Sequence, residues 1–197
     1  MEEYFATFDF VKFCDMAGLV LGLIYLWLEY KANIWLWAVS IVMPIVHGYA
    51  YLERGLYADF SMELYYVLAA IYGFAVWKIK AMKHNNANRS ITHAPTRIMV
   101  LSLAAVAVLW AVIYVLLLQF TDSTVPLYDS FTTAASIVAL WALAQKYVEQ
   151  WLLWLAVDAV CAVLYVYKQI PFTALLYAFY TIMAILGYRK WHKMATS

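Results

Sequence analysis

The sequence predicts an all-α membrane protein with seven transmembrane helices in a single domain, residues 1–197. Hydrophobic residues make up 67% of the 197-residue chain, charged residues only 13%, and the mean hydropathy is +0.75. A soluble domain is nearer half apolar and a quarter charged. This composition excludes a water-soluble globule, a disordered chain, a coiled coil and a disulfide scaffold, and it favours a helix bundle in lipid.

The individual helices follow from the apolar stretches. The clearest span is Ile98–Leu118, whose 21 residues carry no charge. At about 1.5 Å of rise per residue, such a helix crosses a hydrocarbon core of about 30 Å. The other expected spans are Phe10–Leu28, Ala32–Leu52, Leu56–Ile79, Leu127–Gln145, Gln150–Tyr167 and Pro171–Tyr188. Most connections between them are short, and only the loop from Lys78 to Arg97 is long and polar.

The distribution of Lys and Arg predicts the orientation of these helices. The long loop is rich in basic residues, so we expect it in the cytoplasm. Counting helices outward from it places the N-terminus outside and the C-terminus inside, with ten basic residues on the inner side against three on the outer. The acidic start, Glu2 and Glu3, differs from a cleavable signal, which opens with a basic region. We therefore expect a multi-pass protein of a bacterial inner membrane.

An internal repeat emerges when the sequence is shifted by 114 positions. The shift aligns Trp37 with Trp151, Tyr51 with Tyr165, Arg54 with Lys168, Tyr66 with Tyr180, Ala70 with Ala184, Ile71 with Ile185, Gly73 with Gly187 and Trp77 with Trp191. We therefore expect two three-helix repeats at residues 10–79 and 127–191, linked by the helix at 98–118. A single linking helix gives both halves the same orientation, as in parallel-repeat transporters. A duplication kept only for packing is the alternative.

Polar residues inside the spans indicate a binding site, because ionisable groups in a membrane are costly and usually face a cavity or a partner. Trp151, Trp154 and Asp158 stand at i, i+3 and i+7, so they project from one face of their helix. Two indoles beside a carboxylate suit a flat organic cation. The structural alternative is that both Trp belong to the aromatic belt and that Asp158 hydrogen-bonds a neighbouring helix.

A second candidate group lies in the third expected helix. Asp59, Glu63 and Tyr66 share a face at i, i+4 and i+7, and Glu63 has no basic residue within one helical turn of sequence. Asp59, near the outer end, is expected to be solvated. In the second helix, His47 near Pro44 either lines the cavity or, as we favour, satisfies a bent backbone.

Asp129 and Ser130 open the fifth expected helix, and capping that helix is their default role. Lining the cavity is the alternative. The complete set of candidate substrate-binding residues is Trp151, Trp154, Asp158, Glu63, Tyr66, His47, Asp129 and Ser130.

Several chemistries lack the residues that they need. The sequence has no glycine-rich phosphate loop, so the chain does not hydrolyse ATP itself, and the last expected helix has no lysine for a retinal Schiff base. Neither the four His nor the pair Cys14 and Cys161 has a metal-ligand spacing. A net charge of +1 leaves no general basic surface for nucleic acid. We therefore expect neither an enzyme nor a bound cofactor or metal.

Four segments of the sequence carry a family resemblance: KYVEQWLLWLAVD (Lys146–Asp158), GLYADFSMELYYVLAAIYGFAVW (Gly55–Trp77), YDSFTTAASIVA (Tyr128–Ala139) and the G-x-x-x-W of Gly187–Trp191. With these segments, and along nearly its whole length, the sequence resembles the Pnu family of vitamin transporters. It implies a three-plus-one-plus-three helix fold, similar to that of the SWEET sugar transporters, with a site at the membrane centre. It also implies facilitated diffusion of a vitamin or precursor that a cytosolic kinase traps, and assembly as a homotrimer.

The resemblance also implies roles for single residues. Trp151 and Trp154 match the aromatic pair that stacks on the substrate. The nicotinamide riboside branch (PnuC) has Asn where this chain has Asp158 and Gln where it has Glu63. An amide donates and accepts, whereas an ionised carboxylate only accepts, so two carboxylates favour thiamine and the thiamine branch (PnuT). Nicotinamide riboside, which also carries a positive ring, is the alternative, and riboflavin is a third.

The resulting hypothesis is a transport cycle. The substrate enters from outside, stacks between Trp151 and Trp154, and is held by Glu63 and Asp158 from opposite halves of the repeat. The halves then rock around the linker helix and expose it to the cytoplasm. The expected partners are a small-molecule vitamin and the lipid bilayer, with no nucleic acid. The rival class is a membrane scaffold or receptor that does not transport and whose Trp pair is only a belt.

Overall fold

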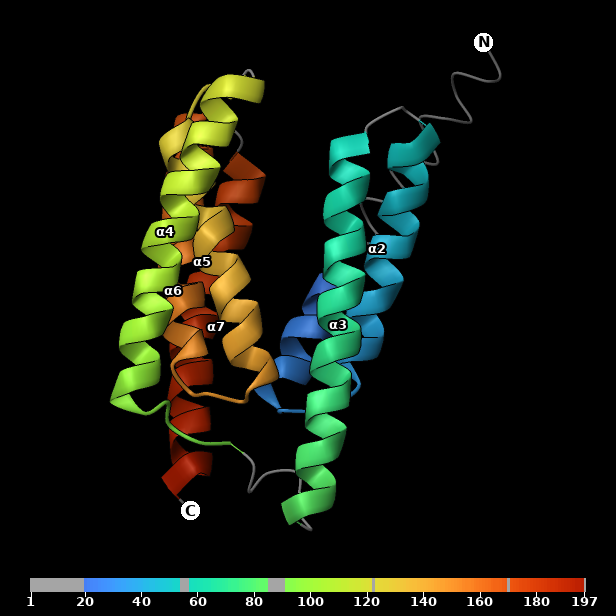
Figure 1. Cartoon of the computed structure of the whole chain (residues 1–197), viewed down its shortest axis with the longest axis vertical. Helices are drawn as coiled ribbons and strands as arrows, with labels where there is room; N and C mark the ends of the chain where they lie inside the picture. Colours follow the sequence, from blue (N-terminus) through green and yellow to red (C-terminus); the bar gives the residue numbers. More distant parts are fainter. Residues whose placement is uncertain (1–19, 54–56, 85–90, 122, 170, 197) are drawn as a thin grey trace. The chain divides into compact units, whose positions relative to one another are not determined.

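The computed structural model describes residues 20–53, 57–84, 91–121, 123–169 and 171–196 of the chain. These residues are almost entirely helical (Figure 1). A helical segment at Val20–Tyr30 is followed by α2 (Leu36–Glu53), α3 (Tyr57–His84), α4 (Thr96–Phe120), α5 (Pro126–Ala144), α6 (Gln150–Tyr167) and α7 (Pro171–Thr196). The predicted all-α class is confirmed for this part of the chain.

Four stretches of the described helices are long and apolar enough to cross a membrane. They are Glu63–Met82 within α3 and the whole of α4, α5 and α6. α4 is the most apolar of them, and Val106 is its buried residue. The chain is therefore a multi-span helical membrane protein, while its N-out, C-in orientation stays a prediction.

α6 begins and ends where the sequence predicts, α7 differs from its predicted span only at its end, and α2 to α5 differ at both ends. α2 begins at Leu36, later than predicted, because residues 31–35 form a turn. α3 continues to His84 and α7 to Thr196, past the last apolar residues of the predicted spans. Both extensions contain lysines, which are good helix formers and can continue an apolar helix into water.

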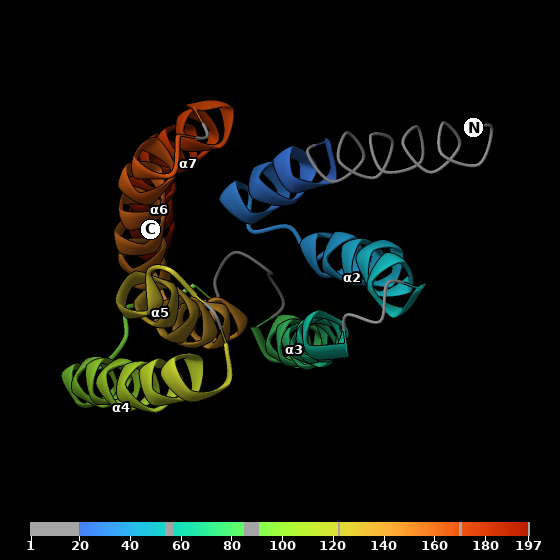
Figure 2. The ribbon, with the colours of Figure 1, turned by 90° about the horizontal axis from the view of Figure 1, so that it is seen from above.

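The described residues form two compact units, one up to Met82 and one from Lys83 onward. In the second unit α4 packs on α5, α5 on α6 and α6 on α7, so these helices form a row when seen from above (Figure 2). α4, expected as a linker between halves, therefore packs within the second unit. The division of residues 10–79, 98–118 and 127–191 into two parallel repeats and a linker stays a prediction.

Two helix ends that lie 114 residues apart are built alike. The helical segment at Val20–Tyr30 and α5 are each followed by a residue with positive φ, Ala32 at 52° and Lys146 at 59°. After the first helix, the N–H of Ala32 donates to the Glu29 carbonyl (2.8 Å) and the N–H of Asn33 to the Leu28 carbonyl (2.9 Å). After α5, the N–H of Lys146 donates to the Leu143 carbonyl (2.8 Å) and the N–H of Tyr147 to the Ala142 carbonyl (3.0 Å). This is the Schellman arrangement, which usually has glycine at the positive-φ position.

The same offset relates two tryptophans that pack on glycines. A Cβ added to Gly73 would come within 2.3 Å of the Trp37 ring, and one added to Gly187 within 2.6 Å of the Trp151 ring. Each ring meets a second indole nearly at right angles, with centroids 5.7 Å apart for Trp37 and Trp77 and 5.9 Å for Trp151 and Trp191. These contacts fix the start of α2 on α3 and the start of α6 on α7.

Candidate functional site

The strongest site candidate is Asp158, in the middle of α6. Only 8% of its surface is exposed, and its carboxylate has no hydrogen bond or ion pair among the described residues. Its helix neighbours Val157 and Cys161 belong to a buried cluster with residues of α4 and α5. Toward α7 it interacts electrostatically with Tyr177 and Tyr180. A buried carboxylate is unfavourable unless it is paired, so this position is suited to receive a cation.

The two predicted tryptophans lie in different surroundings. Trp154 is partly buried and packs against the cluster that contains Cys161. Trp151 is 1% exposed, and its ring lies against Gly187 and Trp191. The indole N–H of each is buried and has no hydrogen-bond partner among the residues that the structure describes. Trp151 therefore anchors α6 on α7, while Trp154 is the indole whose ring is partly accessible.

Three tyrosines near Asp158 are not among the sequence-based candidates. Tyr165 of α6 and Tyr177 of α7 stack nearly in parallel, with centroids 5.3 Å apart at an angle of 11°. Tyr180 meets Tyr177 edge-on at 5.8 Å. Tyr165 follows Asp158 by two helical turns on the same face, so periodicity alone would have found it. Tyr180 aligns with the candidate Tyr66 in the 114-residue repeat, which could have indicated it. Tyr177 depends on how α7 packs on α6, which the sequence does not indicate.

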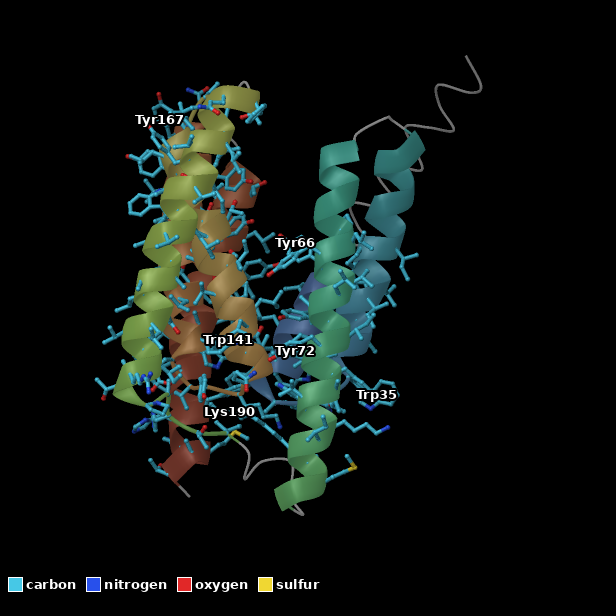
Figure 3. The ribbon with its side chains drawn as sticks, viewed as in Figure 1. Trp35, Tyr66, Tyr72, Trp141, Tyr167 and Lys190 are labelled. Carbon is cyan, nitrogen blue, oxygen red and sulfur yellow. The ribbon has the colours of Figure 1, made fainter. Side chains whose placement is uncertain are left out.

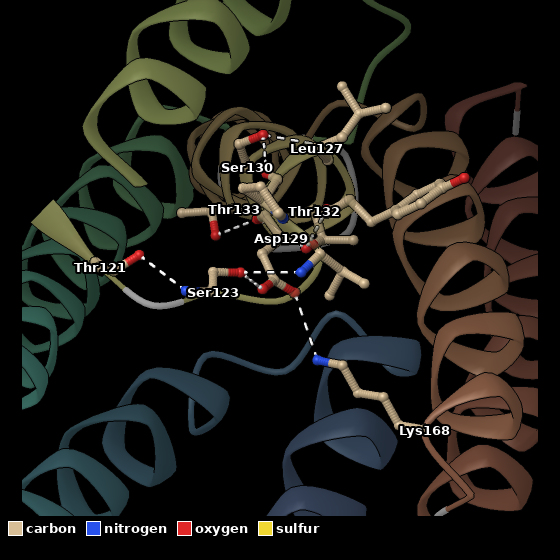
Figure 4. Close-up of polar contacts among 11 residues, drawn as sticks. Thr121, Ser123, Leu127, Asp129, Ser130, Thr132, Thr133 and Lys168 are labelled. Atoms are coloured by element: carbon tan, nitrogen blue, oxygen red, sulfur yellow. Dashed lines mark hydrogen bonds and ion pairs between the residues drawn. The ribbon is translucent and has the colours of Figure 1, made fainter. Parts of the chain in front are cut away.

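Asp129 and Ser130 do not cap α5, contrary to the prediction. The N-cap residue is Val125, which has no side-chain cap, and a proline that needs no N–H partner begins the helix. Asp129 instead accepts a hydrogen bond from Ser123 Oγ (2.7 Å) and lies 3.8 Å from Lys168 Nζ (Figure 4). Ser130 is fully buried, and its hydroxyl donates to a backbone carbonyl of its own helix at 2.6 Å.

The remaining candidates belong to the first unit. On α3, Glu63 is partly buried and Tyr66 is exposed (Figure 3), and both interact with other residues. His47 lies in α2 and Asp59 in α3, but their side chains fall outside the described part of the structure. The expectation that Glu63 and Asp158 hold one substrate together stays a prediction.

A second polar cluster, missed by the sequence analysis, joins three segments at the start of α6. Glu149 Oε1 accepts a hydrogen bond from His93 Nδ1 (2.7 Å), and Glu149 Oε2 accepts a second one from the backbone N–H of Ala94 (2.8 Å). His192 Nδ1 on α7 lies 3.1 Å from His93 Nε2. Across the described residues, no three His, Cys, Asp or Glu are placed to hold a metal ion. Cys161 is a buried free thiol, and Cys14 lies outside the described residues.

Comparison with known proteins places these features in context. Residues 12–193 match the family model described as nicotinamide mononucleotide transporter. The chain is 28% identical over 192 residues to the riboflavin/roseoflavin transporter RibM of Streptomyces davaonensis, covering 96% of this chain and 90% of that one. It is 23% identical over 210 residues to the nicotinamide riboside transporter PnuC of Escherichia coli, covering 92% and 85%. Its fold matches a crystal structure of the vitamin B3 transporter PnuC with a TM-score of 0.67 at 22% identity, over 98% of this chain and 92% of that one.

Proposed function

Because the chain belongs to the nicotinamide mononucleotide transporter family, we propose that it takes up a flat, positively charged vitamin or vitamin precursor by facilitated diffusion. The family and the matching structure are transporters and not enzymes, and the chain is accordingly a multi-pass vitamin transporter of the inner membrane. The resemblance to the Pnu transporters found in the sequence is confirmed by the same matches.

The observation that carries the proposal of a cation is the Asp158 carboxylate. It is buried, it has no partner among the described residues, and the Trp154 ring lies one turn away on the same helix face. A positively charged ring would neutralise the carboxylate and lie against the electron-rich face of the indole. A neutral ring would leave the buried charge unpaired.

Nicotinamide riboside is the substrate with the most support. Its ring carries the positive charge that suits Asp158, and the Escherichia coli relative is named for it. Thiamine, favoured by the two carboxylates in the sequence, has a suitable charge but no support from the names of the relatives described above, so it becomes the second candidate. Riboflavin is the third, because RibM is named for it although its ring is neutral.

The proposed route uses both repeats. The substrate stacks on Trp154, in place of the predicted position between Trp151 and Trp154, because the Trp151 ring is buried against α7. Glu63 and Asp158 hold the polar groups of the substrate. The two halves of the repeat rock relative to one another to release it into the cytoplasm, where phosphorylation by a kinase keeps its free concentration low. Assembly of the chain as a homotrimer is part of the same proposal.

Calorimetric titration of the purified protein with nicotinamide riboside, thiamine and riboflavin tests the proposal. We expect saturable binding of nicotinamide riboside, weakened about tenfold or more by Asp158→Leu because the cation loses its counter-charge and every polar contact at this position. Glu149→Gln is the control, since it removes a carboxylate of the same chain segment that is already paired with His93. This variant should bind as the wild type does.

Two outcomes would contradict the proposal. Binding of riboflavin alone, unchanged by Asp158→Leu, would overturn a cationic substrate, and no saturable binding at all would favour a scaffold or receptor. Efflux of preloaded substrate from proteoliposomes tests the mode of transport. It should proceed without ATP or an ion gradient, and an absolute requirement for a gradient would contradict facilitated diffusion.

A further inference from the structure

Gln150, the first residue of α6, carries a buried amide that the mechanism above does not use. The exposed fraction of Gln150 is 0%. Neither the amide oxygen nor the amide nitrogen has a hydrogen-bond partner in the part of the chain that the structure describes. Buried polar groups are nearly always hydrogen-bonded, and an exception points to a partner that is not part of the chain, such as a water or a ligand.

The equivalent position in the first unit indicates that the fold does not need this amide. Leu36 stands 114 residues before Gln150, begins α2 and is also fully buried. The turns leading into the two helices have matching hydrogen bonds, and Trp37 and Trp151, which follow, pack on glycines in the same way. A leucine therefore fills this environment without a polar atom to satisfy. Packing does not explain why a glutamine stands at the second position.

Gln150 shares a helix face with two residues of the proposed site. Gln150, Trp154 and Asp158 stand at i, i+4 and i+8 of α6, so their Cα atoms lie within an arc of about 80° and span about 12 Å along the helix axis. That span is close to the length of a nucleoside or of thiamine. The indole N–H of Trp154, between the other two, is also buried, and no described residue pairs with it.

We infer that the Gln150 amide is a further substrate-binding residue, which pairs with an adjacent donor and acceptor on the edge of the substrate's ring system. The inference rests on the function proposed above. An amide donates through its NH₂ and accepts through its oxygen, so it matches the carboxamide of nicotinamide riboside in a pair of hydrogen bonds. The aminopyrimidine of thiamine and the imide of riboflavin present edges of the same kind. Gln150 thereby fixes the orientation of the ring and rejects rings that lack such an edge.

Replacing Gln150 by the residue that the first unit uses tests the inference. Gln150→Leu in the full-length protein is compared with the wild type in thermal unfolding and in calorimetric binding of nicotinamide riboside, thiamine and riboflavin. Nicotinic acid riboside, in which a carboxylate replaces the carboxamide, serves as the matched ligand. We expect an unchanged or raised Tm, a loss of affinity for nicotinamide riboside of about tenfold or more, and a smaller loss for the matched ligand. Gln150→Met, unbranched like glutamine, repeats the test in case leucine does not pack.

The outcomes separate this inference from the proposed function. If the wild type binds a vitamin and both variants bind it equally well, the inference is wrong, the proposed function stands, and a trapped water is the partner of Gln150. If both apolar variants lower the Tm, the inference is wrong as well, because the amide then has a structural partner. If the wild type binds none of the three vitamins, the proposed function fails and the inference fails with it.

Discussion

The starts of α2 and α6 are built from the same parts and then differ in what they place along the helix. Both follow a Schellman turn and both pack a tryptophan, Trp37 or Trp151, on a glycine of the next helix. At the matching positions α2 has Leu36, Ser40 and Pro44, whereas α6 has Gln150, Trp154 and Asp158. The Ser40 hydroxyl donates to the Leu36 carbonyl at 2.9 Å. The Gln150 amide and the Asp158 carboxylate, by contrast, have no described partner.

This difference separates the residues that hold the fold from those available for a ligand. Contacts present at both helix starts are explained by packing, because each unit needs them to join two helices. Packing does not explain the Gln150 amide and the Asp158 carboxylate of α6. The matching residues of the first unit, Leu36 and Pro44, have no polar side-chain group. The four predictions below test that separation.

The largest expected effect comes from adding a methyl group to the glycines that the tryptophans cover. Gly187→Ala places a Cβ within 2.6 Å of the Trp151 ring, and Gly73→Ala places one within 2.3 Å of the Trp37 ring. The ring has little room to move, so each variant should lower the free energy of unfolding by about 2–3 kcal/mol. Chemical or thermal unfolding in detergent, followed by circular dichroism, measures this. If only one of the two destabilises the protein, the two helix starts are not equivalent.

Leu36→Gln is the reciprocal of the Gln150 substitution and should have the next largest effect. It puts an amide without a partner into a position that is fully buried. We expect a loss of about 2 kcal/mol in the free energy of unfolding, with ligand binding by the folded protein unchanged. A Leu36→Gln protein as stable as the wild type would show that this environment tolerates an amide in both units. The buried amide of Gln150 would then not indicate a ligand.

Glu149→Gln should destabilise the second unit by about 1–2 kcal/mol, because the carboxylate accepts two hydrogen bonds, one of them from His93. The matching residue of the first unit, Trp35, is 68% exposed. Trp35→Gln is therefore the control and should change stability by less than about 0.5 kcal/mol. The same unfolding measurement compares the two. Equal effects would mean that the cluster at Glu149 contributes nothing beyond an ordinary surface position.

The smallest expected effect is a gain. Ala32 has a φ of 52°, a conformation that glycine adopts without strain. Ala32→Gly should raise the free energy of unfolding by about 0.5–1 kcal/mol. Lys146→Gly should show no such gain, because the Lys146 side chain is buried and has a partner that the substitution removes. A gain in both variants would show that this side chain is not important for stability.

Helix positions were largely predictable because apolar stretches and charges mark them directly. α6 agrees with its prediction at both ends, where Glu149 precedes it and Lys168 follows it. The sequence places the start of α2 too early because the turn before it has Ala32 at a positive-φ position. A glycine at this position would have indicated the turn. The cap of α5 was also misassigned, since its side chains bond to the preceding loop and to the helix itself and not to the free N–H groups.

The candidate site was predictable only where one helix face carries it. Trp154 and Asp158 follow from helical periodicity, and Tyr165 could have been found in the same way. Gln150 could not, because a polar residue at a helix end is ordinarily solvated, and its burial depends on packing between segments. The alignment with Leu36 was the one signal that this position is buried. The burial of Leu36 itself becomes known only from the structure.

The exposure of most α4 side chains has a consequence for how the protein is inserted into the membrane. Val106 is its buried residue, and most of its other side chains face outward from the described structure. Its insertion into the bilayer therefore depends on its own apolar composition and not on partner helices. We expect α4 to leave the translocon unaided and to anchor the growing chain halfway through synthesis. α5 and α6, which carry the buried polar residues Ser130, Gln150 and Asp158, would then assemble beside a helix that is already in place.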